Sequence, residues 1–143
     1  MRPMLLLAMA VSIGSVVLSA RQGPKSHEHD ARWVSPAREA LRANPLANDP
    51  QAAVGGTKLF HQRCSTCHGD DAQGTPDAPS LVSARVQRQS DGALFWKISS
   101  GNARSGMPTF SFLPPLQRWQ LVLSVRAQAR AGGSSRVDEK AQH

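Results

Sequence analysis

The stretch Cys64-Ser65-Thr66-Cys67-His68 decides how this 143-residue chain folds and what it can bind. Two thiols three residues apart, followed at once by an imidazole, are typical of c-type haem attachment. Each cysteine sulfur would add to one vinyl group of haem, and the next residue can then turn its imidazole onto the iron from one face. The pattern therefore predicts Cys64 and Cys67 as the covalent anchors of one haem c, and His68 as an axial ligand of its iron.

Three alternatives compete for the two cysteines. A zinc site needs a second pair of ligands, but Cys64 and Cys67 are the only cysteines and no histidine pair follows at the usual spacing. A redox-active dithiol normally follows a strand and opens a helix, whereas here a helical pattern leads into Cys64. A disulfide across two residues would close almost no loop and would stabilise little. Haem attachment is therefore the favoured interpretation.

The first twenty residues have the pattern of a secretory signal peptide. One positive side chain, Arg2, precedes an uncharged apolar run that ends in small residues at Ala20. We expect cleavage after Ala20 and a periplasmic location, with an uncleaved membrane anchor as the alternative. The remaining chain is expected to divide into a polar linker with a short helix (21–48), a haem domain (49–131) and a disordered tail (132–143).

The charge balance limits the partners. The chain carries 17 basic and 10 acidic side chains, a formal net charge of +7, which could attract nucleic acid, anionic lipid or acidic proteins. Export argues against nucleic acid, and the basic residues are spread out rather than gathered in one run. We therefore expect redox protein partners with acidic docking surfaces, and membrane contact only if the leader is uncleaved.

Hydrophobic periodicity and capping residues predict an all-α domain of about four helices with long irregular loops. Ser35-Pro36 predicts a short helix over residues 37–43, and Asp49-Pro50 predicts a longer one that ends near residue 63. Ser90 or Asp91 is expected to cap a third helix, which Gly101 ends, with an inward face of Leu94, Phe95 and Ile98. A last helix is expected from Pro114 or Pro115 to about residue 129, with an apolar stripe of Leu116, Trp119, Val122 and Leu123.

Gly56 predicts how the terminal helices meet. It lies four residues before Phe60, on the same helix face. A glycine inside a helix costs about 1 kcal/mol relative to alanine, so its presence indicates that another backbone crosses closely there. We expect the last helix to cross at Gly56, so that the two helices close behind the haem.

Met107 is the predicted second axial ligand. The other three methionines lie in the leader, and Gly106-Met107-Pro108 lies in a long irregular loop over residues 102–114. One alternative is that Met107 only fills a gap in the core. Another candidate ligand, His61, is tethered on the attachment side and is expected at the surface.

Taken together, these motifs resemble the class I (mitochondrial-type) cytochrome c family, in particular its bacterial periplasmic monohaem members. The resemblance covers residues 50–129 and implies the small cytochrome c fold around a covalently attached haem. It also implies that the carbonyl of Pro79 accepts a hydrogen bond from Nδ1–H of His68. In the third helix, Trp96 would hydrogen-bond to a haem propionate.

Ligation by both His68 and Met107 would leave the iron no open position. The sequence therefore predicts a one-electron carrier of positive potential rather than an enzyme, either as a monomer or as a subunit of a complex. Two alternatives stay open. One is a five-coordinate haem enzyme or gas-binding protein, if Met107 is not a ligand. The other is a haem subunit docked permanently in a dehydrogenase or oxidase complex, with residues 33–45 as the docking strap.

Overall fold

The computed structural model describes residues 32–140, with side chains from 32 to 132. Within this part the elements are α1 (Ala37–Ala40), α2 (Pro50–Arg63), α3 (Ser65–His68), α4 (Ala84–Gln87), α5 (Asp91–Ser100), the 3-10 turn η1 (Ala103–Ser105) and α6 (Pro115–Lys140). The described residues form two isolated β-bridges and no longer strand, so the predicted all-α class is confirmed. None of the described helices is long and apolar enough to cross a membrane. The predicted signal peptide, residues 21–31 of the linker and residues 141–143 of the tail lie outside the described residues.

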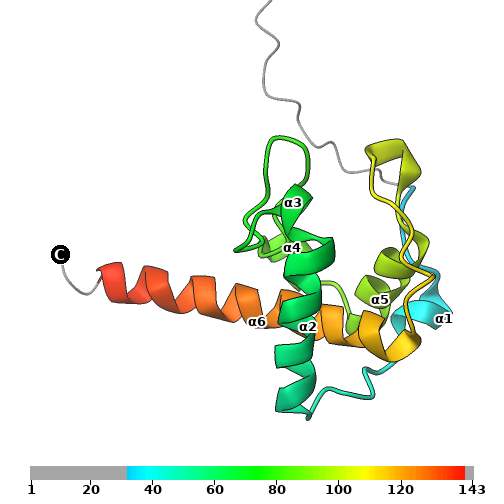
Figure 1. Cartoon of the computed structure of the whole chain (residues 1–143), viewed down its shortest axis with the longest axis horizontal. Coiled ribbons are helices and arrows are strands. Elements are labelled where there is room, and N and C mark those ends of the chain that lie inside the picture. The colour runs from blue at the N-terminus through cyan, green and yellow to red at the C-terminus, as the bar shows by residue number, and fades with distance from the viewer. Residues whose placement is uncertain (1–31, 141–143) are drawn as a thin grey trace, which may run out of the picture.

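Helix α2 crosses α6 in the middle of the domain (Figure 1). Asp49 caps α2 as predicted, because its carboxylate accepts hydrogen bonds from the backbone N–H groups of Gln51 and Ala52 at 2.9 and 3.1 Å. At the crossing, an ideally placed Cβ on Gly56 would lie only 2.6 Å from the carbonyl carbon of Gln120. The close crossing predicted at Gly56 is therefore confirmed, since only a residue without a side chain lets the two backbones approach this closely.

The buried side chains form two clusters. The first core cluster comprises Phe60, Ala72, Phe110, Leu113 and Leu121. The second comprises Leu94, Phe95, Trp119, Val122 and Val125. Ile98 of α5 packs against both clusters, and α6 contributes residues to both. The long last helix therefore joins two halves of the core that are built from different parts of the chain.

The predicted apolar stripe of α6 is only partly present. Trp119 and Val122 are buried, but Leu116 is 56% exposed and Leu123 is half-buried, whereas Leu121 is 1% exposed. The physical reason is that α6 packs against α2 and also against α5. A helix covered from two directions buries a wider sector than the single stripe that a periodicity argument assumes.

Several helix bounds differ from the prediction. Helix α1 is a single turn that ends at Ala40, and Pro36 rather than Ser35 stands at its N-cap without a side-chain cap. Helices α3 and α4 are also single turns and were not predicted. Helix α6 continues to Lys140, through most of the segment predicted as a disordered tail, because no proline interrupts it.

The segment that precedes α2 packs onto the domain. Asn44 is buried, its Nδ2 donates a hydrogen bond to the carbonyl oxygen of Trp119 at 3.3 Å, and its Oδ1 accepts one from the backbone N–H of Leu46 at 2.9 Å. The hydroxyl of Ser90, which caps α5, donates to the carbonyl oxygen of Ala40 at 2.6 Å. These contacts make the described part of the predicted linker an integral brace of the fold.

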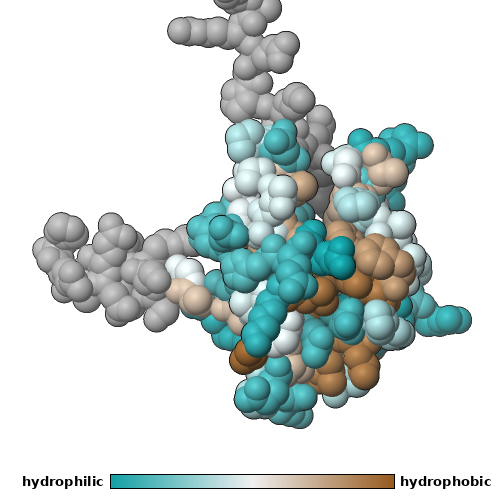
Figure 2. Space-filling view, viewed as in Figure 1, coloured by the Kyte–Doolittle hydropathy of each residue, from teal (hydrophilic) through white to brown (hydrophobic). Residues whose placement is uncertain are grey.

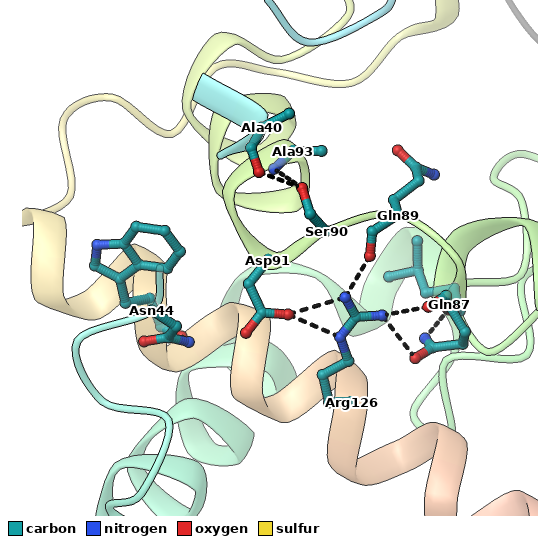
Figure 3. A network of polar contacts seen from close by, with 10 residues as sticks. Ala40, Asn44, Gln87, Gln89, Ser90, Asp91, Ala93 and Arg126 are labelled. Carbon is teal, nitrogen blue, oxygen red and sulfur yellow. Dashed lines mark hydrogen bonds and ion pairs between the residues drawn. The ribbon is translucent and has the colours of Figure 1, made fainter. Parts of the chain in front are cut away.

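Arg126 ties α6 to the turn between α4 and α5 (Figure 3). Its Nε and Nη2 donate to one carboxylate oxygen of Asp91 at 3.0 and 2.9 Å. Its Nη1 donates to the backbone carbonyl and to the side-chain oxygen of Gln87, and its Nη2 also donates to the carbonyl of Gln89. One guanidinium in a fixed fork geometry thus fixes the position of the turn that starts α5.

Candidate haem-binding site

The two cysteines lie at the junction of α2 and α3. Cys64 is the C-cap of α2 and the N-cap of α3, so the attachment sequence forms one tight helical turn at the end of a long helix. Cys64 is half-buried, Cys67 is exposed, and both thiols are free. His68 closes the turn and is half-buried. The turn therefore presents both thiols and the imidazole within five consecutive residues.

The environment of Cys64 helps to decide between haem attachment, a redox-active dithiol and a zinc site. Burial, and to a smaller extent the neighbouring Cys67, raises the pKa of the Cys64 thiol to about 11. Such a thiol is protonated at neutral pH, whereas a redox-active dithiol reacts through its thiolate. The described residues contain no group of three His, Cys, Asp or Glu side chains that could hold a metal ion. These observations support haem attachment over a dithiol or a zinc site.

The loop after α3 folds back onto the attachment turn. The hydroxyl of Thr75 donates a hydrogen bond to the carbonyl oxygen of Cys67 at 2.6 Å. The backbone N–H of Gly74 donates to the carbonyl oxygen of His68 at 2.8 Å. Thr75 was not predicted to contribute, because a hydroxyl residue after a glycine indicates a turn but does not tell which group the turn contacts.

This loop brings Pro79 to the imidazole. Nδ1 of His68 donates a hydrogen bond to the carbonyl oxygen of Pro79 at 2.9 Å. A carbonyl oxygen can only accept, so Nδ1 carries the proton and the lone pair of the ring lies on Nε2. A ring held in this tautomer and orientation is what an axial iron ligand requires. The hydrogen bond implied by the family resemblance is thus present.

Met107 lies in the loop between α5 and α6. Backbone hydrogen bonds join Asn102 and Met107 in both directions, at 2.9 and 3.0 Å, and Asn102 is buried. Gly101, which ends α5, has φ +63°, and an ideally placed Cβ on it would lie 2.5 Å from the carbonyl carbon of Pro108. Main-chain contacts therefore hold Met107 in place within the loop.

The attachment turn and the Met107 loop are built on the same apolar core. Cys64 and Met107 both pack, half-buried, against the first core cluster, together with Leu81 and Ile98. In Figure 1, α3 and the loop that carries η1 rise on the same side of α6. The residues therefore fit a c-type haem: two thiols, one oriented imidazole, one thioether and an apolar surface that Cys64 and Met107 border.

The other two site candidates lie apart from this group. Trp96 is half-buried on α5, and its indole makes no hydrogen bond to any described residue. His61 is exposed on α2, where its Nδ1 lies 3.3 Å from a carboxylate oxygen of Asp70. The surface position expected for His61 is thus present, and the role of Trp96 stays a prediction.

Exposed apolar side chains occur near the start of α6. Phe112 is 65% exposed and Leu116 is 56% exposed. Figure 2 shows hydrophilic side chains over α2 on the viewed face and hydrophobic surface beside it, toward the start of α6. The ring of Phe112 lies 5.9 Å from that of Phe110, which belongs to the first core cluster. This apolar surface therefore continues directly from the core that Cys64 and Met107 border.

Comparisons with known proteins agree with this geometry. The family model described as "Cytochrome C oxidase, cbb3-type, subunit III" matches residues 51–123. The chain is 45% identical over 52 residues to the "Cbb3-type cytochrome c oxidase subunit CcoP" of Rubrivivax gelatinosus, a match that covers 36% of this chain and 16% of that protein. The chain thus spans less than a fifth of the length of this curated relative.

The fold is also similar to that of a solved cytochrome. The crystal structure of cytochrome cL from the marine methylotrophic bacterium Methylophaga aminisulfidivorans MPT aligns with a TM-score of 0.51 and 29% sequence identity. The alignment covers 58% of this chain and 57% of that chain. Because the family model matches about half of the sequence, including the attachment turn and Met107, the chain belongs to the cbb3-type cytochrome c oxidase subunit III family and is a monohaem c-type cytochrome.

Proposed function

We propose that this protein is a one-electron carrier whose haem c is attached through Cys64 and Cys67 and ligated by His68 and Met107. The observation that carries the proposal is the hydrogen bond from Nδ1 of His68 to the carbonyl of Pro79. It leaves the lone pair of the imidazole on Nε2, the nitrogen that an iron ligand must use. Met107, on a loop held by backbone hydrogen bonds to Asn102, would be the second ligand of the iron.

Each part of the chain has a distinct task in this mechanism. The thiols of Cys64 and Cys67 would hold the haem covalently, and the imidazole of His68 and the thioether of Met107 would bind its iron. The bound haem supplies reversible exchange of one electron, and a His/Met ligand pair favours the reduced form. The first core cluster, against which Met107 packs, would shield the thioether from water, which acts in the same direction. With both side chains bound, the iron would have no free position for a substrate.

The surface properties support exchange with other redox proteins. The chain has a formal net charge of +7, so acidic docking surfaces would attract it and the attraction would weaken with salt. Export to the periplasm, as the first twenty residues predict, would put it where c-type haem is attached. We propose acidic redox proteins of that compartment as its partners.

A second candidate function is that of a haem subunit held permanently in a larger complex. The relative from Rubrivivax gelatinosus carries the name of an oxidase subunit. The exposed apolar side chains of Phe112 and Leu116 offer a surface that a permanent neighbour could cover. The strap of residues 33–45 supports this candidate less, because contacts within the domain already occupy it.

An absorption spectrum of the purified, oxidised protein tests the ligand set. We expect the weak near-red band of methionine bound to ferric iron, and a c-type α band after reduction. Met107→Ala should remove the near-red band and lower the reduction potential, whereas His61→Ala, which removes the rival ligand, should change neither. A Met107→Ala protein with an unchanged spectrum would contradict the proposed ligation and would favour the five-coordinate alternative.

Purification from the native membrane and periplasm separates the two functions. A free carrier should run as a monomer in size-exclusion chromatography and should keep its spectrum. A permanent subunit should co-purify with a partner, and Phe112→Ser should weaken that association without changing the absorption spectrum. Persistent co-purification of the Phe112→Ser variant would show that this apolar surface is not the interface.

A further inference from the structure

Lys97 is a buried lysine whose charge no described residue balances. Its side chain lies on α5, and the residue is only 8% exposed. Its ammonium lies 4.5 Å from the centroid of the Trp33 ring, and it makes no ion pair within residues 32–132. A buried ammonium normally has an anionic partner, because removing a charge from water is costly. Residues 32–132 supply no such partner, so a bound anion is the candidate.

Acidic side chains near α5 do not fill this role. Asp91, on α5 itself, is bound by Arg126, with a closest distance of 2.9 Å. Glu39, on α1, is paired with Arg42 at 3.0 Å. Over residues 115–132, where its side chains are described, α6, the other helix packed on α5, contains no Asp or Glu. Asp91 and Glu39 therefore pair with arginines and do not balance the charge of Lys97.

Trp33 provides a second group that lacks a partner. Its indole Nε1 is buried and has no hydrogen-bond acceptor in the described part of the chain. A buried indole N–H normally finds an acceptor, so an unpaired one also indicates a missing group. Because the ammonium of Lys97 lies over the ring of Trp33, the two donors are neighbours. An anion with accepting oxygens would satisfy both.

The surroundings of Lys97 connect this pair to the haem site. Burial, and secondarily the positive charge of Arg85, lowers the pKa of Lys97. Arg85 lies on α4, which follows the Pro79 loop, whereas Lys97 lies on the helix that leads to Met107. The next residue, Ile98, packs against the first core cluster, which Cys64 and Met107 also border. Lys97 is thus close enough to a second cation to be affected by its charge, and no carboxylate of residues 32–132 balances it.

We propose that the ammonium of Lys97 and the indole N–H of Trp33 bind one propionate carboxylate of the attached haem. The proposal rests on the haem attachment proposed above and names residues that the sequence pattern did not identify, since Trp96 was the expected donor. It assigns a role to the segment before α1, because Trp33 belongs to this part of the brace and not to a helix. The carboxylate would balance Lys97 and accept from Trp33, which removes both unpaired groups at once.

The test uses the purified holo-protein and measures its reduction potential from acidic to mildly alkaline pH. A propionate that titrates makes the potential depend on pH, and the midpoint of that dependence reports the propionate pKa. Lys97→Met removes the charge at similar length, and Trp33→Phe removes the N–H while keeping an aromatic ring, although a smaller one. Lys58→Met is the matched control, since Lys58 is an exposed lysine on α2. Lys97→Arg keeps the cation.

We expect the propionate titration to move to higher pH by about one unit in Lys97→Met, because an opposite charge within a few ångströms lowers a carboxyl pKa by about 1–3 units. Trp33→Phe should move it in the same direction by less, and Lys97→Arg should restore the wild-type curve. Lys58→Met should titrate like the wild type. Coloured Lys97→Met and Trp33→Phe proteins with wild-type titrations would overturn the proposal while leaving haem attachment intact.

Two other outcomes would also overturn the proposed propionate contact. A potential that depends on phosphate concentration in the wild type, but not in Lys97→Met, would show that a free anion occupies the position instead of a propionate. A colourless wild-type protein, made together with the haem-attachment machinery, would refute the proposed function and this inference with it. A coloured protein with unchanged titrations would refute only the propionate contact, whereas a colourless protein would refute haem attachment as well.

Discussion

Replacing Gly56 by alanine should separate the two helices at the centre of the fold. An ideally placed Cβ at this position would lie 2.6 Å from the carbonyl carbon of Gln120, and real Cβ atoms essentially never approach another atom closer than 3.0 Å. Carbon atoms pack at about 3.5–4.0 Å, so the backbones must move apart by on the order of 1 Å. The neighbouring Gly55 is the matched control, because its Cβ would meet only the flexible side-chain amide of Gln120, at 3.1 Å.

The size of the effect follows from two opposing contributions. Alanine stabilises a helix interior by about 1 kcal/mol relative to glycine, and this gain applies at both positions. Overpacking costs about 1–3 kcal/mol and occasionally more, and here it falls on backbone that cannot rotate away. We expect Gly56→Ala to lower the free energy of unfolding by about 2 kcal/mol, and Gly55→Ala to leave it unchanged or raise it slightly.

Urea unfolding of the holo-protein, followed by circular dichroism, measures both variants. A change of about 2 kcal/mol corresponds to a shift of about 1 M in the urea midpoint for a small domain. The loss should appear in Gly56→Ala alone. Equal midpoints for Gly55→Ala and Gly56→Ala would refute the reasoning, because they would show that the backbone crossing has room for a methyl group.

Three further changes test other parts of the structure. Arg126→Met should lower the free energy of unfolding by about 2 kcal/mol or more in urea titrations, because it leaves a partly buried carboxylate and two backbone carbonyls without their donor. Asn44→Ala should lower it by about 1–2 kcal/mol, since the variant loses a buried hydrogen bond to the carbonyl oxygen of Trp119 and a half-buried one from the N–H of Leu46. Gly101→Ala should weaken or abolish the near-red band of the oxidised protein, because its Cβ would displace Pro108, whereas Gly106→Ala, with φ +79° and nothing within 4 Å, should retain the band.

The controls for the two stability variants are exposed residues close in sequence. Arg130→Met on α6 and Asn48→Ala before α2 should leave the urea midpoint nearly unchanged. If Arg130→Met costs as much as Arg126→Met, the loss reflects net charge rather than the hydrogen-bonded fork. If Gly106→Ala loses the band together with Gly101→Ala, backbone strain in the loop explains the effect and the contact with Pro108 does not.

The sequence predicted best those features of the fold that depend on local contacts, such as helix caps and the helix crossing at Gly56. The carboxylate of Asp49, the missing side chain of Gly56 and the hydroxyl of Ser90 each act on groups a few residues away or on one crossing backbone, so residue type alone indicated the geometry. The stripe of α6 was mispredicted at Leu116 and Leu123, because burial there depends on two neighbouring helices whose positions no local pattern contains.

The same division applies to the candidate site. The spacing of the cysteines and His68 indicated the attachment turn, and Met107 stood out because the other methionines lie in the leader. Lys97 and Trp33 could not be found in this way, since they are 64 positions apart and each has an ordinary explanation in its own stretch of sequence. Only the folded chain shows that the brace before α1 places an aromatic ring under a buried ammonium.

The hydrogen bonds that hold the imidazole of His68 would affect the rate of electron transfer through the proposed haem. Pro79 holds the ring, and the loop that carries Pro79 is itself bonded back to the attachment turn through Gly74 and Thr75. The orientation of the ring is therefore set by the polypeptide, and a change in the charge of the metal would not require the ring to turn. With His68 as the proposed iron ligand, such a site would have a small reorganisation energy, which would allow rapid transfer to and from partners of nearly equal potential.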